Sequence, residues 1–197
     1  MGLVRTIGPT VEPITLAEVK EDARITTSDD DDTITRLVAV ARDYVERIAG
    51  RSLLDQTWAL SLDAFPTGSG VIELARPPVS AITSVAYTDT DGAGQTVSGS
   101  DYELDSTAWV PSIRPVYGGS WPGARLEPGS VVVTYVAGYG SSSSDIAEHL
   151  RLAVFLIVNH WFEERQVLTN AGAISLSRDV GLSVSALLNI DRVLEVV

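Results

Sequence analysis

Seven consecutive apolar residues, 152–158, constrain the fold of this chain more than any other feature. They follow Asp145 and Glu148, whose spacing is that of a helix capping box, so a helix is predicted through this segment. A helix turns about 100° per residue, and an uninterrupted apolar run of this length therefore leaves no polar face. The run is also too short to span a bilayer, which takes roughly 20 apolar residues. Two interpretations stay open: a central helix of the protein's own core, or a helix buried partly against other subunits.

Charge and composition exclude several classes of function. The chain has 26 acidic and 14 basic residues, a net charge of −12. Proteins that hold nucleic acid normally carry a basic face, because neutralising phosphates supplies most of their affinity. Tight DNA binding is therefore not expected, although an acidic surface is compatible with DNA that slides past. An ordinary acidic surface is the alternative. The absence of cysteine excludes disulfides, thiolate zinc sites and cysteine nucleophiles.

Helix signals dominate the first quarter of the chain. Thr15 and Glu18 have the spacing of a capping box. Behind the acidic run 29–32, apolar residues recur at steps of three and four across residues 34–48, and Gly50 is placed to end that helix. The acidic run suits the positive end of a helix dipole. A calcium site is the alternative, but consecutive aspartates lack the alternating ligand spacing of an EF-hand loop.

Strand and turn signals dominate the middle of the chain. Residues 58–62 and 131–136 are rich in large or β-branched side chains, and Asp91-Gly92 is a strong turn signal. The order of these signals predicts an α+β fold, in which a helical core carries an inserted small antiparallel β subdomain and a C-terminal arm. The predicted regions are an N-terminal helical region at 1–54, a β-rich subdomain at 55–140, a long apolar helix completing the helical core at 141–168, and a C-terminal loop and arm at 169–197. Within the last region, a loop is expected over 169–180 and a short helix or extended arm over 184–197.

The sequence contains no catalytic, metal or cofactor constellation above background. His149 and His160 both fall on the apolar helix, but about 16 Å apart along its axis, so they cannot share a metal ion. A local hydrogen bond or salt bridge between His160 and Glu164 is favoured over a two-ligand metal site. Acidic pairs suited to hydrolysis occur in any acidic chain, and none stands out. The prediction is a non-enzymatic protein without cofactors, with a hydrolase as a minor alternative.

Aromatic side chains in the β-rich subdomain allow a different class of function. Trp58, Trp109, Trp121 and Tyr117 lie in or beside the predicted strands. Such residues in a small sheet are usually core or interface residues. Together they could also form a stacking platform for sugars, which makes a glycan- or receptor-binding β module the alternative function.

Several segments, taken in order, resemble one protein family. They are PITLAEVKEDARI at 13–25, ITRLVAVARDYVERIAGRSLLDQTW at 34–58, LARPPVSAITSVAYTD at 74–89, YELD at 102–105, WPGA at 121–124, VVVTYVAGYG at 131–140 and IAEHLRLAVFLIVNHWFEER at 146–165. This series is similar to the head–tail connector (adaptor) proteins of long-tailed bacteriophages and of gene transfer agents. The resemblance covers roughly residues 13–166 and departs in the tail, where residues 184–192 differ from the proline-led ending of many members.

The resemblance implies a structural function at the head–tail interface of a phage-like particle. Connectors of this family form a ring, commonly twelvefold, below the portal protein, and the stopper or tail-completion protein assembles on it. The expected partners are other copies of the chain, the portal and the stopper, with DNA passing through the channel without specific binding and with no membrane. The residues expected near the core or ring interface are Leu152, Phe155, Leu156 and Trp161. Those expected in an arm that binds portal or stopper are Leu187, Leu188, Arg192 and Val197.

Overall fold

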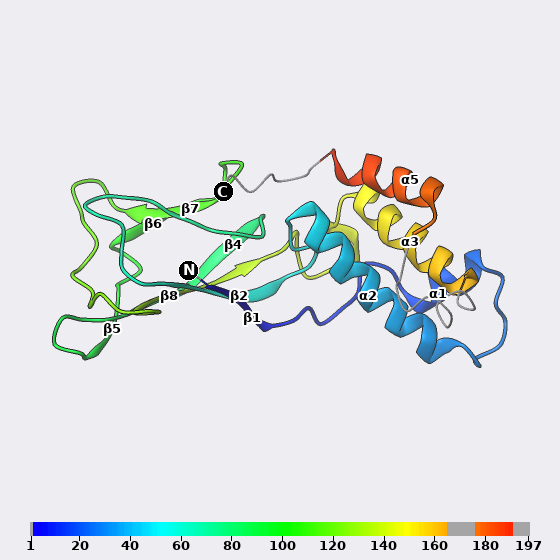
Figure 1. Cartoon of the computed structure of the whole chain (residues 1–197), viewed down its shortest axis with the longest axis horizontal. Coiled ribbons are helices and arrows are strands. Elements are labelled where there is room, and N and C mark those ends of the chain that lie inside the picture. Colours follow the sequence, from blue (N-terminus) through cyan, green and yellow to red (C-terminus); the bar gives the residue numbers. More distant parts are fainter. Residues whose placement is uncertain (1, 165–175, 191–197) are drawn as a thin grey trace. The chain divides into compact units, whose positions relative to one another are not determined.

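The computed structural model describes residues 2–164 and 176–190 (Figure 1). They divide into two compact units with separate sets of internal contacts. The β unit comprises the residues up to Pro9 and residues 55–139, and the helical unit comprises residues 10–54 and the described residues from Gly140 onward. Helices and antiparallel strands both occur, which confirms the predicted α+β class.

The β unit is built from two antiparallel sheets. The larger sheet has the order β1 (Gly2–Ile7), β2 (Gln56–Leu62), β8 (Val131–Ala137), β4 (Val79–Thr88) and β5 (Gly94–Thr96). The smaller sheet has the order β3 (Ile72–Glu73), β7 (Ser112–Pro115) and β6 (Tyr102–Asp105).

The core of the β unit follows from strand alternation. Successive side chains of a strand point to opposite faces, and in β8 every second residue from Val131 to Ala137 is buried. Tyr135 is fully buried, and its hydroxyl donates to the Ala75 carbonyl at 2.9 Å. Trp121 stacks on Phe65 with ring centroids 5.0 Å apart. The sheet faces therefore enclose one apolar cluster.

The first residues of the chain differ from the prediction, which placed all of residues 1–54 in the helical core. Gly2–Ile7 forms strand β1, which pairs antiparallel with β2. Leu3 lies opposite Leu60 and packs against the apolar cluster of the β unit. The pairing partner lies more than fifty residues away along the chain, so no local pattern revealed it.

The helical unit consists of α1 (Leu16–Asp22), α2 (Asp31–Ala49), the 3₁₀ turn η1 (Ser143–Asp145), α3 (Glu148–Glu163) and α5 (Arg178–Leu188). Helix α3 contacts α1, α2 and α5, and Figure 1 shows it between α2 and α5. Its residues Leu150, Ala153, Val154, Ile157 and Val158 are buried. The apolar run thus contributes much of the core of this unit.

Helix ends were predicted with mixed success. The capping box of Thr15 and Glu18 is present, and Gly50 ends α2 in a left-handed conformation with φ 69°. The box predicted for Asp145 and Glu148 is wrong. Asp145 instead closes a capping box with Ser142 on η1, and α3 begins without a side-chain cap.

The predicted loop over 169–180 is also too long at its C-terminal end. Helix α5 already begins at Arg178, behind Ser177 as its N-cap. Val184 and Leu188, on one side of this helix, are buried. The polar sequence before Val184 did not indicate a helix. Packing of α5 against α3 explains why the helix nevertheless begins at Arg178.

Candidate functional site

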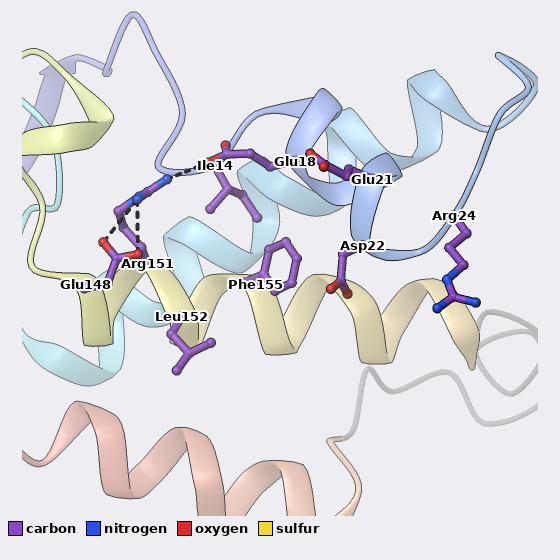
Figure 2. Close-up of a pocket in the computed structure, with 9 residues that line it drawn as sticks. All are labelled: Ile14, Glu18, Glu21, Asp22, Arg24, Glu148, Arg151, Leu152 and Phe155. Carbon is purple, nitrogen blue, oxygen red and sulfur yellow. Dashed lines mark hydrogen bonds and ion pairs between the residues drawn. The ribbon is translucent and has the colours of Figure 1, made fainter.

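A groove runs between α1 and α3 on the helical unit (Figure 2). Its volume is about 610 Å³. Its walls come from α1 and the residues flanking that helix, and from the first half of α3. The lining residues are Ile14, Glu18, Glu21, Asp22, Arg24, Glu148, Arg151, Leu152 and Phe155.

Arg151 fixes α3 to the segment that carries α1. Its Nη2 lies 2.7 Å from Glu18 Oε1, and its Nε donates to the Pro13 carbonyl at 3.1 Å. Its Nη1 also pairs with Glu148 Oε2 at 3.1 Å, one turn earlier on α3. The Arg151 side chain is 19% exposed, so these contacts are partly shielded from water.

Glu18 is held as a carboxylate by its place in the capping box. Its Oε2 accepts hydrogen bonds from the Thr15 backbone N–H at 2.6 Å and from the Thr15 hydroxyl at 2.8 Å. The Thr15 backbone hydrogen bond lowers the pKa of Glu18, and the charge of Arg151 adds to this effect against partial burial. The carboxylate therefore keeps its charge, and its contact with Arg151, under mildly acidic conditions.

A second polar contact joins α1 to α3 toward the other end of the groove, which Arg24 also lines (Figure 2). Asn159 Nδ2 donates to Asp22 Oδ2 at 2.8 Å. Between the two ends lie Leu152 and Phe155, and in Figure 2 the Phe155 ring points from α3 toward α1. The groove therefore has an apolar middle, with four carboxylates and two guanidinium groups around it. Such a surface suits a partner segment that is apolar in its middle and basic at its ends.

The four residues predicted near the core or ring interface do not share one environment. Leu152 is 45% exposed and Phe155 is half-buried, and both line the groove. Leu156 is half-buried on the same helix. Trp161 is 3% exposed and contacts Tyr44 of α2 edge-on, with ring centroids 6.0 Å apart. Trp161 is thus a core residue, whereas Leu152 and Phe155 leave apolar surface uncovered in the groove.

The residues predicted for a binding arm divide in a similar way. Leu187 is half-buried and Leu188 is fully buried at the end of α5. Arg192 and Val197 lie outside the described residues. In this structure Leu188 belongs to the core of the helical unit.

His160 has a local structural role. Its Nε2 accepts a hydrogen bond from the Ser177 backbone N–H at 3.0 Å, which ties the start of α5 to α3. Glu164 Oε2 lies 3.5 Å from the same nitrogen, the local contact that the sequence predicted. Among the described residues, no three His, Cys, Asp or Glu side chains gather as metal ligands.

Of the four aromatic residues predicted for a sugar-stacking platform, Trp121 is a core residue, whereas Tyr117 is fully exposed. Trp121 is buried against Phe65, and its Nε1 donates to the Gly70 carbonyl at 2.7 Å. Trp109 is 57% exposed, and the ring of Trp58 lies 5.6 Å from the Arg76 guanidinium. Because Trp121 is a core residue, it cannot stack on a sugar beside Trp109.

The buried charge cluster around Arg42 on α2 was not predicted from the sequence. Arg42 has a side chain 7% exposed, with Glu12 at 2.8 Å, Asp43 at 2.7 Å and Glu46 at 3.4 Å. Glu46 Oε1 also accepts from the Leu53 backbone N–H at 2.9 Å. Burial lowers the pKa of the Arg42 guanidinium, but the hydrogen bond to Glu12 and the charges of Glu12, Glu46 and Asp43 together outweigh it, and the pKa ends above its ordinary value. The spacing of Arg42 and Glu46 was the one available signal.

None of the helices in the described residues has the length and hydropathy that a membrane crossing requires.

Comparison with known proteins gives one family and one fold. The model of the head completion protein family matches residues 12–175. A chain from the neck of an empty gene transfer agent particle, computed with C6 symmetry, aligns with a TM-score of 0.80 at 22% identity, covering 100% of this chain and 98% of that one.

Two further solved chains align over the same shares of both chains, 100% and 98%. One is from the virion of a native gene transfer agent particle, with a TM-score of 0.78 and 23% identity. The other is from the neck of a native particle computed with C12 symmetry, with a TM-score of 0.75 and 23% identity. No curated protein matches the sequence.

At these identities the solved structures show a shared fold, and the family model covers most of the chain. The resemblance drawn from the order of sequence segments is thereby confirmed. The chain belongs to the head completion protein family.

Proposed function

We propose that this protein is a structural head–tail connector of a phage or phage-like particle. It forms a ring below the portal, docks the stopper or tail component, and surrounds the channel through which DNA passes. It acts by assembly: docking on the portal completes or stabilises the ring, and the finished ring creates the site for the next component. Its place in the particle is the head–tail interface, reached from the host cytoplasm during assembly.

The main structural support for this proposal is the apolar surface that α3 leaves exposed. Helices α2 and α5 pack against α3, yet Leu152 stays 45% exposed and Phe155 half-buried in the groove toward α1. Complete burial of an exposed leucine or phenylalanine contributes about 1.5–3 kcal/mol, so covering the exposed part of either side chain contributes about half of that. A connector ring uses two different faces of each subunit, and this groove is suited to be one of them.

The family and the shared fold support the same assignment. The family is that of head completion proteins, and the chains with the same fold come from the neck and virion of gene transfer agent particles. Neck structures computed with C6 and C12 symmetry are consistent with a ring of identical subunits. The common twelvefold ring of connectors is therefore the expected form in the particle.

The acidic balance of the chain supports a channel that does not hold DNA. With a net charge of −12, the protein repels phosphates wherever its charges face the lumen. Titration of the assembled ring with duplex DNA at low salt should give no tight complex. A tight complex would contradict this aspect of the proposal.

The portal- or stopper-binding arm is proposed for the end of the chain from Leu187 to Val197, of which residues 187–190 are described. Leu187 is half-buried at the end of α5, whereas Leu188 is in the core. The residues that follow Leu188, including Arg192, are thus better candidates for partner contact than Leu188 itself.

The solution mass of the purified chain tests the proposal, alone and mixed with a cognate portal protein. A ring-sized species, or a monomer that the portal recruits into a ring, supports the connector function. A monomer that ignores the portal refutes it. Glycan screening of the β unit would then be the next measurement, with Trp109→Ala as its control.

A further inference from the structure

The exposed face of α2 carries a short line of basic and apolar side chains. Arg36, Val40, Tyr44 and Arg47 are all exposed, with Val40 at 45% and Tyr44 at 36%. These positions are separated by four, four and three residues, so they fall on one side of the helix. We name this line the α2 ridge. It is apolar in its middle and cationic at both ends, and the carboxylate of Asp43, which lies on the same side of the helix, is paired with Arg42.

The α3 wall of the groove carries a matching line of opposite character. Glu148, Leu152 and Phe155 line the groove, and Asn159 lies one turn beyond Phe155. The four residues are separated by four, three and four residues, so they too share one side of a helix. Glu148 has a side chain 85% exposed at one end of the line. At the other end Asn159 holds the carboxylate of Asp22. The line is apolar in its middle, with the Glu148 carboxylate at one end, whereas the other end carries the carboxylate of Asp22 from α1 together with the Arg24 guanidinium (Figure 2).

The two lines have the same length. Arg36 and Arg47 are eleven residues apart on α2, and Glu148 and Asn159 are eleven residues apart on α3. At the helical rise, each line is about 16 Å long. Either direction of the ridge along the groove therefore brings one of its cations toward Glu148 and the other toward Asp22, and its apolar residues to Leu152 and Phe155.

We infer that the α2 ridge of one copy occupies the α1–α3 groove of the next copy. This inference rests on the proposed ring and names the two faces that build it. The contact is heterologous, because ridge and groove are different surfaces of the same chain, and such contacts generate closed rings when the rotation between copies closes.

The charge of the α1–α3 groove favours the basic α2 ridge as its occupant. The groove holds the carboxylates of Glu18, Glu21, Asp22 and Glu148 against the guanidinium groups of Arg24 and Arg151. Arg151 is already paired with Glu18 and Glu148. The excess is acidic, so a basic amphipathic helix gains from entering the groove and an acidic one is repelled.

Cross-linking tests the contact directly, since the natural chain has no cysteine. The double variant Val40→Cys/Leu152→Cys is assembled, alone or on the portal, and treated with a short bis-maleimide. A ladder of covalently linked subunits is expected, and each single variant should give no ladder. The matched control Val40→Cys/Leu182→Cys places the second thiol on an exposed α5 residue outside the groove and should also give no ladder.

Charge reversal supplies an independent test. A ridge variant, Arg36→Glu/Arg47→Glu, and a groove variant, Glu21→Lys/Glu148→Lys, should each lose ring formation. An equimolar mixture should recover it, because each reversed surface then meets its reversed partner and each natural surface meets a natural one. Circular dichroism of each chain checks folding, and Glu21→Lys alone replaces the groove variant if the double substitution unfolds it.

The outcomes separate this inference from the connector function. If the natural chain forms no ring, alone or on the portal, the proposed function fails and the inference with it. If the natural chain forms rings but the double-cysteine variant gives no ladder, or both charge-reversed variants still assemble alone, the connector function stands and the ridge-in-groove contact is wrong. A portal segment would then be the alternative occupant of the groove.

Discussion

The Nη2 atom of Arg151 lies 2.7 Å from Oε1 of Glu18, so an ion pair joins α3 to the short helix α1 beside the groove. Glu18 takes part in this pair while its other oxygen, Oε2, accepts from the backbone and hydroxyl of Thr15. One carboxylate thus caps α1 and anchors it to α3. The shape of the groove depends on this pair, because α1 forms its second wall.

The stabilising effect of Glu18 should depend on pH. Its pKa is lowered in the folded protein from the usual 4.5, so its contribution is present above that value and is lost as pH falls through the lower folded value. The side chain is 43% exposed, so solvent screens the pair. Glu18→Gln should lower the free energy of unfolding by roughly 0.5–1 kcal/mol near neutral pH. Urea unfolding at neutral and acidic pH should show this difference shrinking below the usual pKa, and a constant difference would contradict the assignment.

Among the charged residues of the helical unit, Arg42 should be the one whose substitution lowers the free energy of unfolding most. Its removal leaves the buried carboxylate of Glu46, and the partly buried one of Glu12, without their cation. Arg42→Ala should therefore cost about 3–5 kcal/mol of unfolding free energy. Asp43→Asn is the matched control, because Asp43 contacts the same guanidinium but is 49% exposed and should cost less than about 1 kcal/mol. Equal losses in thermal or urea unfolding would show that burial does not decide the effect.

Two glycines of the helical unit should respond in opposite directions to alanine. A Cβ on Gly140 would lie 2.8 Å from the Asp145 Cβ and would displace the capping box of Ser142 and Asp145, at a cost of about 1–2 kcal/mol. A Cβ on Gly181, inside α5, would meet the Leu176 Cβ at an ordinary 3.8 Å. Gly181→Ala should stabilise the protein by about 0.5–1 kcal/mol, because alanine has the higher helix propensity. Melting temperatures that shift in the same direction would refute this pair of predictions.

Local patterns predicted the elements that local physics determines. The capping box of Thr15 and Glu18, the glycine end of α2 and the turn at Asp91-Gly92 depend on neighbouring residues, and the structure contains all three. Strand β1 and the first turn of α5 depend instead on distant partners, β2 and α3 respectively. A single sequence does not specify such partners, which is why both elements were missed.

Only the α3 side of the groove could be predicted from the sequence. The uninterrupted apolar run singled out Leu152 and Phe155, but it did not distinguish them from the core residue Trp161. That distinction depends on which sides of α3 are covered by α2 and α5. The acidic wall from α1 could not be predicted either, because it depends on contacts between distant parts of the chain. Asp22 and Asn159, for example, are 137 residues apart.

Tyr135 should stabilise the β unit through its hydroxyl as well as its ring. The hydroxyl donates to the Ala75 carbonyl at 2.9 Å in a fully buried setting, and burial raises the pKa of the phenol far above its ordinary value. Tyr135→Phe keeps the packing but leaves that carbonyl without its donor, so a loss of about 1–2 kcal/mol is expected. Urea unfolding followed by tryptophan fluorescence measures it. Tyr117→Phe, at a fully exposed side chain, should change nothing.

Substitution of Leu152 should prevent ring assembly with less effect on folding than substitution of any other apolar residue of α3. Because it is 45% exposed in the isolated chain, Leu152→Asp should change the free energy of unfolding by about 1 kcal/mol or less. In the proposed ring, the same substitution places a carboxylate in an apolar contact that is already acidic at its rim, and ring formation should be abolished. Phe155→Asp should abolish it as well, with a larger loss of stability because that ring is half-buried.

Leu182→Asp provides the control for this prediction. Leu182 is 62% exposed on α5 and does not line the groove, so its substitution adds the same charge to the same unit without touching the proposed contact. Light scattering of the three chains, alone and with the portal protein, should give rings for the natural chain and for Leu182→Asp. The Leu152→Asp chain should stay monomeric while its circular dichroism spectrum is unchanged. Normal rings from Leu152→Asp would remove this side chain from the interface, and loss of rings from Leu182→Asp would show that added charge alone prevents assembly.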